Sequence, residues 1–181
     1  KAEPLCQRAL KINEKAHGPD HPGVATSLNN LAILYKLQAQ YAKAEPFYLR
    51  SLKIREKALG PDHPRVATSL DNLAMVYNGQ AQYAKAEPLC QRALKINEKA
   101  LGPDHPDVAQ SLTTLAEVYR SQAQYAKAEP LYQRGLKIWE KALGPDHPHV
   151  ATSLDNLALL HNYQAQYAKA EPLCQRALKI N

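Results

Sequence analysis

The sequence predicts an all-α fold, an α-solenoid of stacked antiparallel helix pairs. One stretch, Gln-Ala-Gln-Tyr-Ala-Lys-Ala-Glu-Pro, occurs four times without change at intervals of 42 residues, beginning at Gln38, Gln80, Gln122 and Gln164. A second, Gly-Pro-Asp-His-Pro, keeps the same interval, beginning at Gly18, Gly60, Gly102 and Gly144. A fixed period of this size is typical of stacked-repeat proteins. The sequence contains no strand signals.

The second motif sets the expected repeat boundaries. We expect a leading half-repeat at 1–17, full repeats at 18–59, 60–101 and 102–143, and a truncated repeat at 144–181. No linker interrupts them, so residues 1–181 are expected to form a single array. In such an array each unit packs on its neighbours, and stability is approximately a sum of unit and interface contributions.

The Gly-Pro-Asp-His-Pro motif is predicted to end one helix and begin the next. In the second repeat, Gly60 suits a left-handed conformation just beyond a helix end. Pro61 cannot continue that helix, and Asp62 is expected to cap the next one. Pro64 is tolerated in a first turn because its missing N–H has no partner there.

The first helix of this repeat is predicted over 65–80, where apolar residues recur at helical spacing. Equivalent first-type helices are predicted at 23–38, 107–122 and 149–164. A second-type helix over 83–101 has an unusually wide apolar face, which suits a helix with neighbours on more than one side. Helices of this second type are also expected at 2–17 and from residue 167 onward.

Composition is ordinary for a soluble globular chain, with 45% hydrophobic and 22% charged residues. The sequence has no apolar run of about 18 residues, so we expect no membrane span. The net charge of +6 could suggest nucleic acid. Acidic residues such as Glu45 and Glu56 are interleaved with the basic ones, however, which favours a solvated helix face and no nucleic-acid partner.

The three cysteines recur at one repeat position, at intervals of 84 residues: Cys6, Cys90 and Cys174. Tyr48 and Tyr132 occupy the same position in the intervening repeats. Sites two repeats apart are expected to lie beyond the limit of about 7 Å for a disulfide. The position is therefore predicted to be an interchangeable packing site, with buried thiols in a reducing, cytoplasmic compartment.

An Asp-His pair in every loop is the nearest approach to catalytic or metal chemistry. A catalytic site is seldom copied once per repeat, and no nucleophile is placed beside the pair. A metal needs three or four convergent ligands, although His149 near His147 leaves weak metal contact open there. The sequence predicts no catalytic residues, no metal site and no cofactor.

These features resemble the tetratricopeptide repeat, with Ala74 and Ala86 matching the small residues where its paired helices cross. The usual repeat has 34 residues; this 42-residue form resembles the repeats of kinesin light chains, notably in Ala86–Ile96 and Leu28–Ala32. The resemblance implies a right-handed superhelix. It also implies that first-type helices line a concave groove where partner peptides bind.

The candidate groove residues follow from that register, and they mix acid with base. They are Asn29, Asn30, Ile33, Lys36, Asp71, Asn72, Met75, Asn78, Thr113, Thr114, Glu117, Arg120, Asp155, Asn156, Leu159, Asn162 and Tyr163. One amide per repeat (Asn30, Asn72 and Asn156) offers both a donor and an acceptor to a peptide backbone, and Thr114 interrupts this ladder. The alternative is that these asparagines bond to their own or neighbouring helices.

Two functions remain open on the sequence alone. The leading interpretation is a non-enzymatic protein–protein interaction scaffold that binds a peptide segment of a partner in the groove. The alternative is a self-associating structural or spacer array, a homo-oligomer that stacks end to end through uncapped terminal helices. The near-identity of the repeats favours the alternative, whereas their differences fall mainly on the polar face of the first-type helices.

Overall fold

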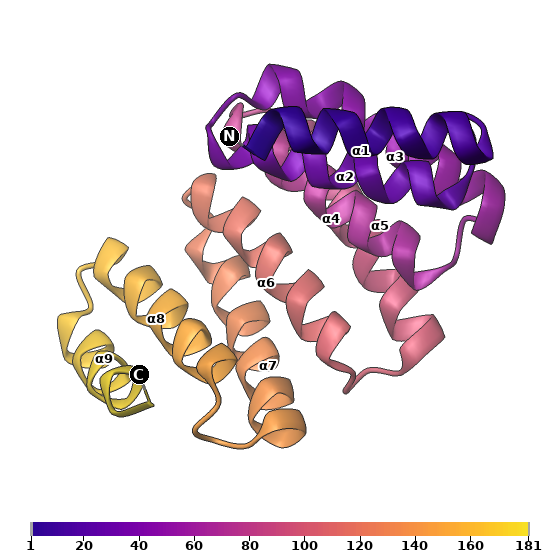
Figure 1. The fold of residues 1–181 in the computed structure, drawn as a ribbon. Coiled ribbons are helices and arrows are strands. Elements are labelled where there is room, and N and C mark those ends of the chain that lie inside the picture. The colour runs from indigo at the N-terminus through magenta and orange to yellow at the C-terminus, as the bar shows by residue number, and fades with distance from the viewer. Residues whose placement is uncertain (1, 181) are drawn as a thin grey trace. The chain divides into compact units, whose positions relative to one another are not determined.

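The computed structural model describes residues 2–180, and this part of the chain forms nine helices and no strand (Figure 1). The helices are α1 (Ala2–His17), α2 (Pro22–Leu37), α3 (Tyr41–Leu59), α4 (Pro64–Gly79), α5 (Tyr83–Leu101), α6 (Pro106–Ser121), α7 (Tyr125–Leu143), α8 (Pro148–Tyr163) and α9 (Tyr167–Ile180). The predicted all-α solenoid class is confirmed. First-type helices begin at the motif proline, one residue before the predicted start.

The chain divides into two units, residues 1–96 and 97–181, with the boundary inside α5. In the first unit α2 packs against α1 and α3, and α3 packs against α4. In the second, α7 packs against α6 and α8, and α8 packs against α9. Short turns join neighbouring antiparallel helices in each unit (Figure 1).

The core of the first unit lies between first-type and second-type helices. Val24, Ala25 and Leu28 of α2 are fully buried, and Ile54 of α3 packs among them at 3% exposure. Burying one such branched apolar side chain stabilises the fold by about 1.5–3 kcal/mol. The same repeat positions are buried in the second unit: Val108, Ala109, Leu112 and Ile138.

Histidine, not aspartate, caps each first-type helix, which corrects the sequence prediction. His63 has extended backbone angles, and its Nδ1 accepts a hydrogen bond from the N–H of Arg65 at 3.1 Å. His21, His105 and His147 make the same bond at the same distance. The motif aspartate precedes the cap position and can turn toward a lysine instead: Asp20 pairs with Lys57 at 2.7 Å.

Both connections of each repeat contain a residue with positive φ. Gly60 has φ 87° and donates its N–H to Glu56 O at 3.0 Å, so glycine relieves strain where the second-type helix ends. Ala81 has φ 57° in the turn between the paired helices. An L-residue with a Cβ adopts this conformation at a cost of about 1–2 kcal/mol. Ala39, Ala123 and Ala165 repeat it.

The cysteine position is a packing site, as predicted. The prediction of a buried thiol is confirmed for Cys90 but was wrong for Cys6 and Cys174, which are half-buried. None of the three forms a disulfide in the described part of the chain. Tyr48 and Tyr132 are also buried, and the Tyr48 hydroxyl has no hydrogen-bond partner within residues 2–180. Burial raises the pKa of both phenols. In the same described range, no helix is both long enough and apolar enough to cross a membrane.

Candidate functional site

The predicted groove residues lie on the four first-type helices but differ in accessibility. Five are exposed: Asn30, Asp155, Leu159, Asn162 and Tyr163. Ten are half-buried: Asn29, Ile33, Lys36, Asn72, Met75, Asn78, Thr113, Glu117, Arg120 and Asn156. Two are buried, Asp71 and Thr114, so their side chains are poorly placed to meet a ligand.

In the first unit, two of these residues bond to each other. The Asn72 amide on α4 donates to the Asn29 carbonyl oxygen on α2 at 3.3 Å. This contact matches the alternative expectation, in which asparagines join neighbouring helices. A side-chain amide carries two N–H donors and two acceptor lone pairs. Asn72 therefore retains one donor and its acceptor for a ligand while the bond to Asn29 holds its orientation.

In the third repeat, both threonines bond to their own helix. The Thr113 hydroxyl donates to Ala109 O at 2.9 Å, and the Thr114 hydroxyl donates to Gln110 O at 3.1 Å. This bond to the preceding turn is common for threonine within a helix. The third repeat therefore presents no amide where the others have asparagine, and its hydroxyl donors are already used.

An aromatic and guanidinium cluster lies at the end of α8 in the second unit. The Tyr163 ring is stacked on the ring of Tyr125, with centroids 6.1 Å apart and planes inclined by 7°. The Arg120 guanidinium carbon lies 5.7 Å from the Tyr163 centroid, within the range of a cation–π contact. Tyr163 is 56% exposed, so the cluster offers a ring face and a cation to solvent.

Sequence reasoning found Tyr163 and Arg120 but missed Tyr125, because Tyr125 belongs to the unchanged motif. The same motif tyrosine behaves differently in the first unit. There Gly79 stands in place of Tyr163, and a Cβ on Gly79 would lie 2.5 Å from Cζ of Tyr41. The Tyr41 ring therefore occupies the space that a side chain at position 79 would need.

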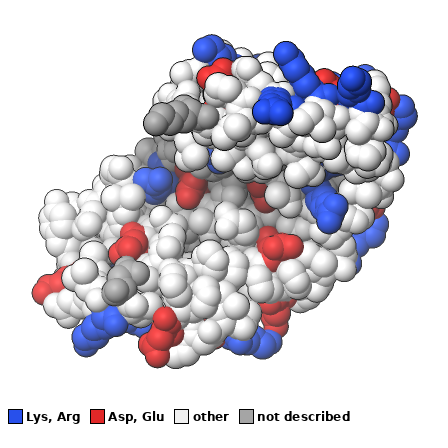
Figure 2. Space-filling view, in the orientation of Figure 1, with Lys and Arg blue, Asp and Glu red and all other residues white. Residues whose placement is uncertain are grey.

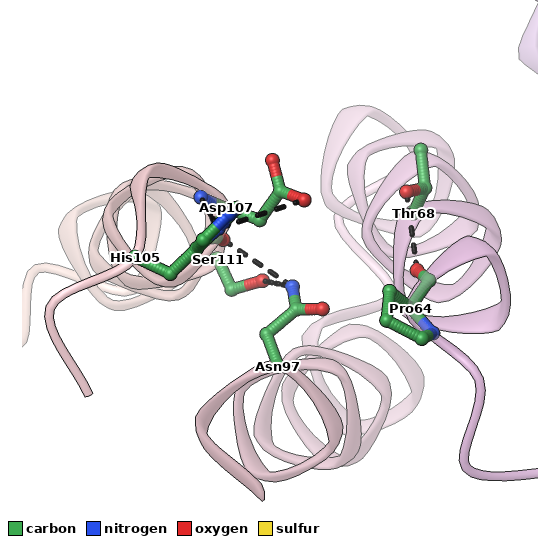
Figure 3. Close-up of polar contacts among 6 residues, drawn as sticks. All are labelled: Pro64, Thr68, Asn97, His105, Asp107 and Ser111. Atoms are coloured by element: carbon green, nitrogen blue, oxygen red, sulfur yellow. Dashed lines mark hydrogen bonds and ion pairs between the residues drawn. The ribbon is translucent and has the colours of Figure 1, made fainter. Parts of the chain in front are cut away.

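A second feature missed in the sequence is how second-type helices bind first-type helices. Asn97 of α5 donates to Ser111 Oγ at 3.0 Å and to Asp107 O at 3.3 Å (Figure 3). Asn13 and Arg55 bond to the equivalent serines, Ser27 and Ser69.

On α7, Trp139 stands at this position in place of a polar residue. It is buried and stacks on His149, with ring centroids 4.6 Å apart. His149 in turn lies 5.1 Å from His147. The pair of imidazoles noted in the sequence is thus part of an aromatic stack. Within residues 2–180, His, Cys, Asp and Glu side chains form no group of three or more that could hold a metal ion.

Charge is mixed over the surface that Figure 2 presents, where basic and acidic side chains are interspersed among uncharged ones. Several lysines lie over tyrosine rings: the Lys43 Nζ is 5.6 Å from the Tyr35 centroid, and the Lys85 Nζ is 5.1 Å from the Tyr77 centroid. Among the candidate groove residues, acidic Glu117 lies on the same helix as Arg120, and acidic Asp155 lies on the same helix as two asparagines. The faces are therefore suited to polar contacts of both signs.

The tetratricopeptide repeat family model matches the chain at residues 1–57, 37–87, 71–141 and 113–181. No curated protein matches the sequence. BtubC (BKLC) from P. vanneervenii is 26% identical with a TM-score of 0.81, over 99% of this chain and 71% of that one. The nearly identical TPR-like repeats of a Podosopora anserina protein described as a kinesin light chain are 27% identical, with a TM-score of 0.74 over 99% of this chain and 85% of that one.

A more distant structure shares the fold alone. A Rap protein, solved in complex with the Competence and Sporulation Factor, is 18% identical, with a TM-score of 0.86 over 99% of this chain and 48% of that protein.

Proposed function

The chain belongs to the tetratricopeptide repeat family, and we propose that it binds an extended segment of a partner protein along its first-type helices. Repeats of this family generally serve as protein–protein interaction scaffolds and are generally non-enzymatic. In this proposal the peptide lies against the exposed faces of these helices. Cysteines that form no disulfide within residues 2–180 support a reducing, cytoplasmic location as part of it.

The main support for the proposal is that the buried residues of the first-type helices are the same in every repeat, whereas some of their surface residues differ. The fully buried leucine of each first-type helix is unchanged: Leu28, Leu70, Leu112 and Leu154. Five residues further on, a position that is half-buried or exposed holds a different residue in every repeat: Ile33, Met75, Glu117 and Leu159. A scaffold that reads a non-repetitive peptide needs different side chains at each step, whereas a spacer does not. This pattern supports ligand recognition.

The chemistry of these faces suits a peptide with main-chain and apolar contacts. Leu159 and Tyr163 are exposed and lie four residues apart on α8, so they share one face. Asn162 is exposed beside them and Asn156 is half-buried, and their amides can pair with a peptide N–H or C=O. The Rap protein complex supports the general capacity of this fold to hold a ligand.

The test is a selection of binders followed by mutation. A phage-displayed random peptide library would be selected against the whole chain, and recovered peptides measured by fluorescence anisotropy. We expect the double change Asn162→Ala and Tyr163→Ala to weaken binding about tenfold or more, since aromatic anchors carry much interface energy. Gln133→Ala, an exposed change on second-type helix α7, is the matched control. Failure to recover binders, or equal loss in both variants, would contradict groove binding.

Self-association is the second candidate, because large apolar side chains are exposed on α1 and α9. Ile12 on α1 is 56% exposed, whereas Ile54 at the same repeat position is 3% exposed. Leu178 on α9 is 77% exposed. Such surface on two separate helices favours association of copies. Sedimentation equilibrium over a wide concentration range tests this: a mass that rises and returns to monomer on Leu178→Ser supports it, and a constant monomer mass overturns it.

A further inference from the structure

The second-type helices carry a repeated trio of basic residues. On α3 these are Arg50, Lys53 and Lys57, whose spacing of three and four residues places them on one face. We call this trio and its equivalents the basic edge. The equivalents are Arg8, Lys11 and Lys15 on α1, Arg92, Lys95 and Lys99 on α5, Arg134, Lys137 and Lys141 on α7, and Arg176 and Lys179 on α9.

The arginine of the trio contacts the preceding second-type helix and the loop that begins its own repeat. Arg50 Nη1 lies 2.6 Å from Glu14 Oε1 on α1, and Arg50 Nη2 donates to Pro19 O at 3.1 Å. The last lysine is also paired, since Lys57 Nζ lies 2.7 Å from Asp20 Oδ2. The second unit repeats both pairs, Arg134 with Glu98 at 2.6 Å and Lys141 with Asp104. These contacts fix the flanks of the edge.

The middle lysine of the trio is the one left for a ligand. Lys53 is exposed and borders a cavity of about 300 Å³, lined also by Asp20, Arg50, Ile54 and Lys57. Lys57, through its hydrogen bond and charge, holds the pKa of Asp20 below its usual range, and Lys53 and Arg50 add to this. The cavity is therefore electropositive even though it contains one carboxylate.

The distance between successive middle lysines determines how a peptide ligand would have to space its acidic residues. Direct contacts join neighbouring second-type helices in the first unit: Arg50 with Glu14, and Arg92 with Glu56 at 2.8 Å. Packed helices lie about 8–10 Å apart, and helices joined only through long side chains lie at least that far apart, whereas an extended chain advances about 3.3 Å per residue. One repeat step thus matches about three residues of an extended peptide.

We propose that Lys11, Lys53 and Lys95 form a second binding surface, which takes an extended acidic peptide segment with a carboxylate at about every third residue. This surface lies on second-type helices and goes beyond the proposed groove function. Each lysine donates to one carboxylate, and beside Lys53 the flanking Arg50 and Lys57 are already neutralised by Glu14 and Asp20. A second such row begins with Lys137 and Lys179 in the second unit.

Charge density favours a protein segment over nucleic acid. Duplex DNA carries about one negative charge per 1.7 Å of axis, but the edge offers one uncommitted lysine per step of about 10 Å. Most of its other cations are already neutralised by glutamate or aspartate. A peptide with spaced carboxylates matches this density.

The test uses fluorescein-labelled peptides of about twelve residues with the whole protein, since such a peptide spans about four repeat steps and so covers the two steps from Lys11 to Lys95. One has glutamate at every third position between glycine and serine; the other has the same composition with its glutamates consecutive. We expect the spaced peptide to bind about fivefold or more tighter, from matched spacing. A single-stranded RNA of equal charge should bind less tightly than the spaced peptide.

Two matched double variants distinguish binding at the basic edge from a general effect of the protein's net charge. Lys53→Gln with Lys95→Gln removes two lysines of the edge, and Lys43→Gln with Lys85→Gln removes two exposed lysines from the same helices. We expect the first pair to weaken the spaced peptide about fivefold or more, as each exposed ion pair contributes modestly, and the second pair to change little. Equal loss in both, no preference for the spaced peptide, or tighter RNA binding would overturn the proposal.

Discussion

The Nδ1 atom of His63 accepts the backbone N–H of Arg65 at 3.1 Å, and the same bond recurs in every Gly-Pro-Asp-His-Pro loop. This bond satisfies one of the N–H groups that a helix leaves unpaired at its start. We expect His63→Ala to lower the free energy of unfolding by about 1 kcal/mol, as loss of a cap generally does. Urea unfolding followed by circular dichroism measures it.

Asparagine provides the control at this cap. Since asparagine accepts the same type of bond at the start of a helix, His63→Asn should retain most of the stability that His63→Ala loses. If the alanine variant unfolds at the wild-type urea concentration, the imidazole contributes no cap. Asp62, the residue predicted to cap, should then be tested in its place.

The helix cap also separates the features that the sequence predicts from those that it does not. Periodicity alone predicts the repeat length and the helix pairs. It also predicts the buried leucine of each first-type helix and the packing role of Cys90, because each depends on local pattern. Periodicity does not predict the cap, because both Asp62 and His63 are plausible caps in the sequence, and only the structure shows that the helix begins at Pro64, which puts His63 at the cap position. The sequence of one repeat likewise does not predict the contacts that its residues make with other repeats.

The candidate groove residues also show what the sequence does not predict. Register placed all the candidates on first-type helices, but could not separate buried Thr114 from exposed Tyr163. Nor could it show that Asn72 donates to Asn29, or that Tyr125 supports Tyr163. Whether a residue is buried depends on side chains from other repeats, and the local sequence does not show which of these pack against it.

The left-handed alanine in each interhelix turn leads to a second prediction. Ala81 has φ 57°, a conformation that glycine adopts without steric cost. We expect Ala81→Gly to raise the free energy of unfolding by about 0.5–1 kcal/mol, because relief of strain exceeds the added freedom of the unfolded chain. The control is Ala9→Gly at an exposed position inside α1, which should cost about 1 kcal/mol. Equal destabilisation by both changes would contradict strain at Ala81.

Two buried tyrosines should respond oppositely to loss of the hydroxyl. The Tyr48 hydroxyl is buried without a partner in the described residues, whereas the Tyr77 hydroxyl donates to Glu45 Oε1 at 3.1 Å. Removing an unpaired buried hydroxyl should raise the free energy of unfolding by about 1 kcal/mol. Removing a bonded one should lower it by about 1 kcal/mol. Thermal unfolding of Tyr48→Phe and Tyr77→Phe compares them, and a loss in both would indicate an ordered water at Tyr48.

Alkaline stability follows from the pKa of Tyr132, which burial raises to about 12, with the nearby Glu117 charge adding to the effect. An unfolded tyrosine has a pKa near 10. Folding therefore favours the neutral phenol, so its contribution is complete below about pH 10 and is lost as the pH rises from there toward 12. We expect Tyr132→Phe to move the alkaline unfolding midpoint upward relative to wild type, because phenylalanine cannot ionise.

Tyrosinate absorbance distinguishes this cause from general loss of ion pairs at high pH. In the wild type, the fraction of tyrosinate that forms only with unfolding should include Tyr132, and that fraction should be smaller in Tyr132→Phe. Tyr167→Phe, at a 67% exposed position on α9, is the matched control. It removes one phenol from the titration but none from the core, so its unfolding midpoint should stay at the wild-type pH. An equal upward shift in both variants would show that burial of Tyr132 does not control the transition.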